Sequence, residues 1–164
     1  MEVPTFYIKN FRENDDSKSE LERLLDHKTE KIVFRLLQER GGAISMVAFS
    51  GKKNHKNFRD GVILKLNVHP SGAKLDITNR EVFLGDQEIS EKNDETKVKE
   101  ISILKALVNQ KDQEYIIINP LEIDTVEKNI VYEFFTKPDL IGFSTSGIGK
   151  LAIKPNPSPP YNGY

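Results

Sequence analysis

Apolar residues in the first 42 positions recur with two different periods. Residues 5–11 are rich in aromatic and β-branched side chains, which predicts a short strand. Further on, apolar side chains recur at helical spacing between the capping residues at 15–17 and the stop signal Gly41-Gly42. These positions are Leu21, Leu24, Leu25, Ile32, Val33, Leu36 and Leu37. They predict one long helix, or two helices with a break near Lys28, where the apolar stripe is interrupted.

Strand-like patterns follow this helix. Residues 62–69 alternate between apolar and polar side chains, as expected for a strand with one face on a core. The sequence HPSG at 69–72 favours a type I turn. Strands are predicted at residues 43–50, 62–69, 74–78 and 81–84. Residues 1–92 are therefore expected to form an α+β region in which an N-terminal helix packs on a small antiparallel meander.

A polar stretch, SEKNDETK at residues 90–97, contains the boundary between the two halves of the chain. One apolar stripe predicts a helix over 94–110, and EYIII at 114–118 predicts a short strand. Asp124-Thr125 can cap a second helix, which Lys137-Pro138-Asp139 ends. Its apolar positions are Val126, Ile130, Val131, Phe134 and Phe135. Residues 140–154 are expected to form a hairpin around a Ser/Gly-rich turn, and residues 156–164 a flexible Pro-rich tail.

The order of helix, strand, helix and hairpin resembles the winged helix-turn-helix superfamily. The resemblance covers about residues 95–155 and rests on the segments ISILKAL, NIVYEFF and LIGFSTSGIGKLAIKP. It implies a winged-helix-like unit over residues 93–155. In that superfamily the last helix usually enters the DNA major groove and the wing contacts the backbone or minor groove. The resemblance thus assigns nucleic-acid contacts to Lys128 and Asn129 on the helix and to Ser146, Lys150 and Lys154 on the wing.

The charge balance limits how such a unit could bind DNA. The chain has 24 Lys and Arg against 25 Asp and Glu, so no global positive field attracts phosphates. One dense basic patch stands out, and its candidate contacts are Lys52, Lys53, His55, Lys56, Phe58 and Arg59. This patch predicts a phosphate-contacting loop in which Phe58 stacks on a base. A solvated loop that serves solubility is the alternative.

Acidic side chains on the second predicted helix favour a different partner. Glu122, Asp124, Glu127 and Glu133 would repel phosphates. Winged helices also dock proteins. A protein–protein interaction adaptor, inhibitor or assembly subunit is therefore the second hypothesis.

Composition excludes several kinds of chemistry. The absence of Cys excludes disulfides, thiolate metal sites and a Cys nucleophile. His27, His55 and His69 form no metal-ligand spacing, and Ser144–Leu151 lacks both the first Gly and the final Ser/Thr of a phosphate loop. Scattered carboxylates leave a metal-dependent hydrolase as a third hypothesis, with Asp60, Asp76, Asp86 and Glu88 as its candidate ligands. We expect no catalytic residue, metal site or cofactor.

No segment of the sequence suits a membrane. No apolar run approaches the ~20 residues that a span requires, and the N-terminus lacks the basic start and apolar run of a signal peptide. A soluble, cytoplasmic chain without a membrane partner is expected. The leading hypothesis is a non-enzymatic regulatory or accessory protein that binds nucleic acid, foremost DNA, through the winged-helix-like unit and the basic loop.

Overall fold

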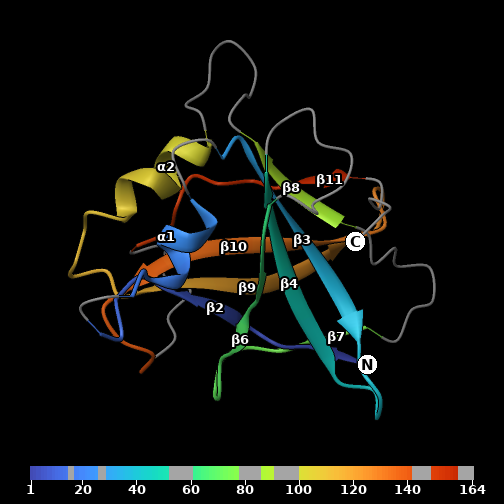
Figure 1. Ribbon diagram of the computed structural model, residues 1–164. Coiled ribbons are helices and arrows are strands. Elements are labelled where there is room, and N and C mark those ends of the chain that lie inside the picture. The colour runs from blue at the N-terminus through green and yellow to red at the C-terminus, as the bar shows by residue number, and fades with distance from the viewer. Residues whose placement is uncertain are drawn as a thin grey trace.

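The structure is a computed structural model that describes residues 1–14, 17–25, 29–51, 61–77, 86–90, 100–141 and 149–158, with the backbone alone at 86, 88, 90 and 156–158. Within these ranges, eleven strands form three antiparallel sheets, and the chain has two helices besides (Figure 1). The strands are β1 (Glu2–Val3), β2 (Phe6–Lys9), β3 (Lys31–Gln38), β4 (Ile44–Gly51), β5 (Val62–Lys65), β6 (Asn67–Val68), β7 (Leu75–Asp76), β8 (Asp86–Ser90), β9 (Tyr115–Asp124), β10 (Asn129–Lys137) and β11 (Asn156–Ser158). The fold is therefore mostly β, and the predicted α+β class is wrong.

The largest sheet has the strand order β11-β8-β3-β4-β5. Residues Lys31–Gln38, predicted as the second part of a helix, form β3 and pair with β4 along their whole length. Both glycines of the connecting turn have positive φ, 90° at Gly41 and 89° at Gly42, where glycine fits without strain. The predicted helix stop is thus a hairpin turn, and no N-terminal helix packs on a meander.

The second sheet has the order β10-β9-β2-β6. The segment NIVYEFF, predicted as a helix, lies in β10 and pairs with β9, so the winged-helix-like unit is also wrong. The predicted helix cap is a turn instead. The Oδ1 atom of Asp124 accepts hydrogen bonds from the backbone nitrogens of Val126 and Glu127, and Lys128 has a φ of 55°. β-Branched and aromatic side chains dominate β10, which favours a pleated strand.

One core joins the two larger sheets. Figure 1 shows β3 and β4 of the first sheet crossing over β9 and β10 of the second. The rings of Phe34 on β3 and Phe134 on β10 meet edge to face, with centroids 5.9 Å apart. The same cluster of buried side chains also includes Phe6, Ile89 and Ile153, so it draws on both sides of the boundary expected near residue 92.

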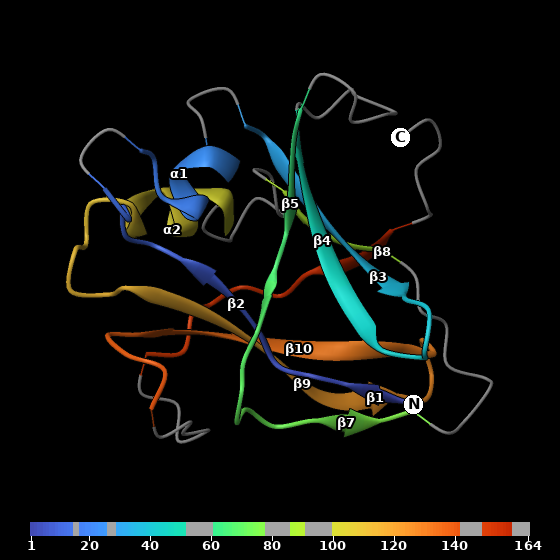
Figure 2. The same ribbon diagram turned by 60° about the horizontal axis from the view of Figure 1, so that its bottom comes forward.

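Two short helices lie together at one end of the molecule (Figures 1 and 2). Helix α1 (Glu20–Leu24) starts with a capping box between Ser19 and Glu22 and buries Leu21 and Leu24. Helix α2 (Glu100–Leu107) confirms the predicted helix of the second half; it ends before Gln110, and residues 94–99 of the prediction lie outside the described residues. No helix in the described ranges is long and apolar enough to cross a membrane.

The predicted strands have mixed outcomes. Those at 43–50, 62–69 and 74–78 correspond to β4, to β5 with β6, and to β7, while those at 5–11 and 114–118 correspond to β2 and the start of β9. The strand predicted at 81–84 lies outside the described residues. So do residues 142–148 of the predicted hairpin at 140–154, and Lys150, in its second arm, forms an isolated bridge with Phe135 of β10. Residues 156–158 of the predicted tail form β11, which pairs with β8.

Candidate binding site at the open edge of β10

Strand β10 lies at the edge of its sheet. Two hydrogen bonds show which of its backbone groups face away from β9. Phe134 O accepts from the backbone nitrogen of Leu151 at 2.8 Å, and the backbone nitrogen of Thr136 donates to Gly149 O at 2.9 Å. Because strand residues alternate, the N–H and C=O groups of Ile130 and Tyr132 face the same edge. No strand in the described part of the chain pairs with them there.

A pocket of about 320 Å³ borders this edge. Segment 149–155 runs beside β10 as far as Leu151 and then leaves it, and Lys154 and Pro155 form the far side of the pocket. The backbone nitrogen of Lys154 donates to Oε1 of Glu100 at 3.2 Å, which ties this segment to α2. The pocket thus lies between β10 and residues 152–155, and the hydrogen bond to Glu100 of α2 fixes its far side.

Two carboxamide side chains line the pocket. Gln87 on β8 and Asn129 at the start of β10 are only 7% and 6% exposed. Gln87 lies opposite Phe34 in the ladder, so it points to the interior face of the first sheet. Neither side chain forms a hydrogen bond with another residue that the structure describes. Neither side chain has a polar atom that is fully buried without a partner, so both amide groups can be reached from the pocket and can bind a ligand there.

The rim of the pocket carries charges of both signs. Asp124 and Glu127 lie at the β9–β10 turn, and Lys154 lies on the far side. Neither carboxylate forms an ion pair within the described ranges. Between these carboxylates and Lys154 the pocket wall is largely apolar, because Ile130 and Tyr132 also line the pocket. Burial raises the pKa of the Tyr132 phenol far above its usual range, so Tyr132 stays neutral.

The structure places only some of the predicted nucleic-acid contacts. Asn129 and Lys154 line this pocket, and Lys128 lies in the adjoining turn. Lys150 donates from Nζ to Oε1 of Glu133 at 3.1 Å, so its charge is already paired. The other predicted contacts lie outside the described residues; they are Lys52, Lys53, His55, Lys56, Phe58, Arg59 and Ser146. Gln87 was missed, because nothing in its local sequence signals its burial.

A second pocket, of about 380 Å³, lies beside Asn10, Arg12 and Glu22. Arg12, Glu22 and the amide nitrogen of Asn10 are engaged in contacts within the protein, whereas Oδ1 of Asn10 is buried without a partner. Arg12 donates from Nε and Nη2 to the two carboxylate oxygens of Glu22 at 2.9 and 2.7 Å. Asn10 donates from Nδ2 to the backbone oxygens of Leu107 and Gln113. These contacts join β2, α1 and the end of α2, so they have a structural role.

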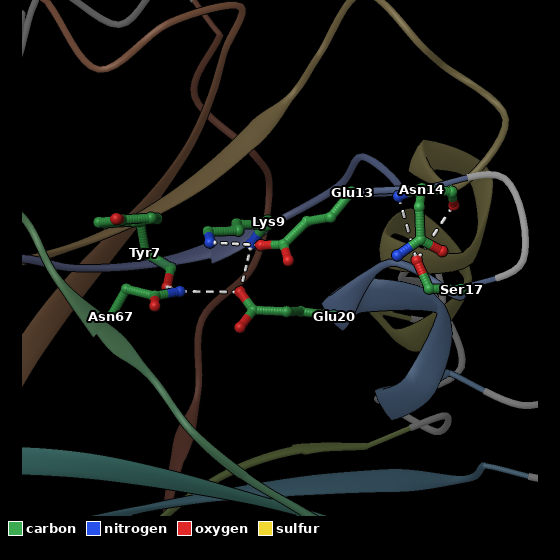
Figure 3. Close-up of polar contacts among 7 residues, drawn as sticks. All are labelled: Tyr7, Lys9, Glu13, Asn14, Ser17, Glu20 and Asn67. Carbon is green, nitrogen blue, oxygen red and sulfur yellow. Dashed lines mark hydrogen bonds and ion pairs between the residues drawn. The ribbon is translucent and has the colours of Figure 1, made fainter.

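A polar cluster around Glu20 is also structural. Figure 3 shows the Glu20 carboxylate of α1 facing β2 and β6. Its Oε1 atom accepts from the backbone nitrogen of Lys9 at 2.9 Å and from Nδ2 of Asn67 at 2.8 Å. Nearby, Nζ of Lys9 pairs with Glu13. The carboxylates of Glu20 and Glu13 therefore bind donors of the protein itself, and these contacts have a structural role.

The metal hypothesis finds no support among the described residues, which contain no group of three His, Asp or Glu side chains able to share an ion. Asp76 pairs with the N-terminal ammonium group at 3.4 Å. His69 is buried and accepts from the backbone nitrogen of Ser71 through Nδ1, and burial lowers its pKa. Asp60, His27, His55 and the side chains of Asp86 and Glu88 lie outside the described residues.

Comparisons with known proteins return no match: no family model, no curated protein and no solved structure is similar to this chain at a significant level.

Proposed function

We propose that this protein is a non-enzymatic protein-interaction module, an adaptor or assembly subunit, that binds an extended segment of its partner along β10. One observation carries the proposal. In the part of the chain that the structure describes, the β10 edge at Ile130 and Tyr132 is unpaired and adjoins a pocket into which two nearly buried carboxamides, Gln87 and Asn129, bring unused hydrogen-bonding groups.

An added strand is a general mode of peptide recognition. The main-chain groups of the edge provide the affinity, and neighbouring pockets select side chains. Folded proteins usually protect an open edge with charges, proline or a covering segment. Here the edge at Ile130 and Tyr132 lacks such a cover among the described residues, because the segment after Leu151 moves away from it. Acidic groups at the turn, Asp124 and Glu127, favour a polypeptide over a phosphate backbone.

The experiment is a selection of random, extended peptides against the full-length protein, followed by affinity measurements on two matched variants. Val131 lines the pocket, whereas Leu121 is exposed in the bulged region of β9. Val131→Arg should weaken binding at least tenfold, and Leu121→Arg should leave it unchanged. The amide protons of Ile130 and Tyr132 should also become protected from solvent in the complex. Failure to select any peptide, or equal loss in both variants, would overturn the proposal.

A further inference from the structure

The pocket beside β10 offers groups that match a peptide main chain. Ile130 and Tyr132 present donors and acceptors along one line, at the strand edge. Asn129 and Gln87 add two carboxamides, each of which can donate to one main-chain carbonyl and accept from one main-chain N–H. The ligand strand would continue the line that residues 149–151 follow beside β10 before the chain diverges. An extended peptide therefore satisfies groups that have no partner among the residues the structure describes.

The charges indicate which side chain such a peptide carries. The Asp124 carboxylate is held in place by the backbone nitrogens of Val126 and Glu127, at 2.9 and 3.0 Å through Oδ1. The Glu127 side chain is exposed beside it and has no ion pair in the described part of the chain. Two carboxylates at one end of the groove favour a cation there. Lys154, on the far side, disfavours a second cation next to it.

We propose that the pocket binds an extended peptide that carries a lysine or arginine, with its main chain on Ile130, Tyr132, Asn129 and Gln87 and its basic side chain against Asp124 and Glu127. This inference rests on the proposed function and specifies the class of its ligand.

The test uses the full-length chain and a series of blocked, fluorescent peptides of alternating Thr and Val with one variable central residue. The peptide with central Lys should bind at least tenfold more tightly than the peptide with central Glu, and the Gln peptide should fall between them. The advantage of Lys should shrink with added salt. Methylation of the backbone nitrogens next to the central residue should abolish binding, because it removes the donors of an added strand.

Two variants locate the effect. Glu127→Gln should reduce the preference for Lys over Glu at least threefold, and Gln87→Leu should weaken all peptides alike. Glu13→Gln, near α1, is the matched control, and it should change neither. Equal binding of the Lys, Gln and Glu peptides would overturn this inference and leave the proposed function standing. Absence of binding by every peptide would overturn both. The peptide series on the unaltered protein decides the matter even where a variant fails to fold.

Discussion

The Glu20 carboxylate accepts the hydrogen bond from the backbone nitrogen of Lys9 that a neighbouring strand would otherwise accept. Strand β6 pairs with β2 at Phe6 and Tyr7, and beyond that point Oε1 of Glu20 accepts the hydrogen bond from the backbone nitrogen of Lys9. The same oxygen accepts from Asn67 on β6 (Figure 3). A helix side chain thus closes the end of a β-ladder, which fixes α1 on the sheet.

Replacement of Glu20 should therefore destabilise the fold. Glu20→Ala leaves two donors without their acceptor, and we expect a loss of about 1–3 kcal/mol in the free energy of unfolding, measured by urea denaturation. Glu13→Ala is the control, since Glu13 forms only an exposed ion pair with Lys9. Its effect should be much smaller than that of Glu20→Ala, because solvent screens an exposed ion pair. Equal effects of the two substitutions would show that Glu20 has no such role.

The ion pair of Arg12 and Glu22 predicts a pH dependence. Hydrogen bonds from Arg12 lower the pKa of Glu22 from 4.5 to about 2. A lowered carboxyl pKa stabilises the folded state above the unfolded pKa, and this stabilisation is lost as the pH falls. The difference in unfolding free energy between the wild type and Glu22→Gln should thus be full above about pH 4.5 and vanish near pH 2. Denaturation at a series of pH values measures it, and a difference independent of pH would contradict the pairing.

Gly149 allows the close approach of residues 149–151 to β10. Its φ is 79°, and a Cβ atom there would lie 2.5 Å from the backbone oxygen of Thr136. Gly149→Ala should cost more than the ~1–2 kcal/mol of a left-handed residue alone. Gly41→Ala is the matched control, because its φ is 90° but its Cβ would meet nothing within 4 Å. Thermal unfolding compares the two, and a smaller loss for Gly149→Ala would contradict the contact.

The shared core predicts a single unfolding transition. Phe134 is 1% exposed and packs on Phe34 of the other sheet, so Phe134→Ala should cost about 3–5 kcal/mol. Both sheets should unfold together, with fluorescence and circular dichroism giving the same midpoint. Val126→Ala at the exposed hairpin turn should change stability by less than about 0.5 kcal/mol. Two separate transitions would show that the sheets are independent.

The nucleic-acid hypothesis for the basic loop makes its own prediction. If Lys52, Lys53, Lys56 and Arg59 contact phosphates, labelled duplex DNA should bind at micromolar protein in low salt. Affinity should fall steeply with added salt. The fourfold alanine variant should then lose binding, while substitutions around the β10 pocket should have no effect. DNA binding that survives the fourfold substitution would exclude this loop as the contact.

The sequence predicted α2 correctly, because the apolar residues of this helix lie on one face. In α2 the buried residues Ile101, Leu104 and Leu107 form one stripe, and its helix was found. In β3 both faces are buried, with Ile32 and Phe34 in the main core and Val33 in a separate cluster. The alternation is then lost, and Ile32, Val33, Leu36 and Leu37 mimic helical spacing. Strand β10 resembles a helix in sequence for the same reason: Phe134 and Phe135 are adjacent and both buried, so the alternation of a strand is lost.

The candidate site at β10 could not be predicted from local sequence, because it depends on contacts between distant segments. The sequence predicts nucleic-acid contacts at Asn129 and Lys154. In the structure these two residues line the same pocket, because residues 152–155 diverge from β10. Gln87 becomes buried only because β8 pairs with β3 and places it opposite Phe34. Such a register joins residues far apart in the chain, and no local pattern reports it.

The passage from β5 to β6 has a mechanical consequence. Residues 62–68 leave one sheet and enter the other with only Leu66 between the two strands, and the backbone nitrogen of Leu66 still donates to Met46 O. A force applied to one sheet is therefore transmitted to the other through the main chain, because a single residue joins β5 to β6. A force applied along β10 would therefore act on both of the larger sheets.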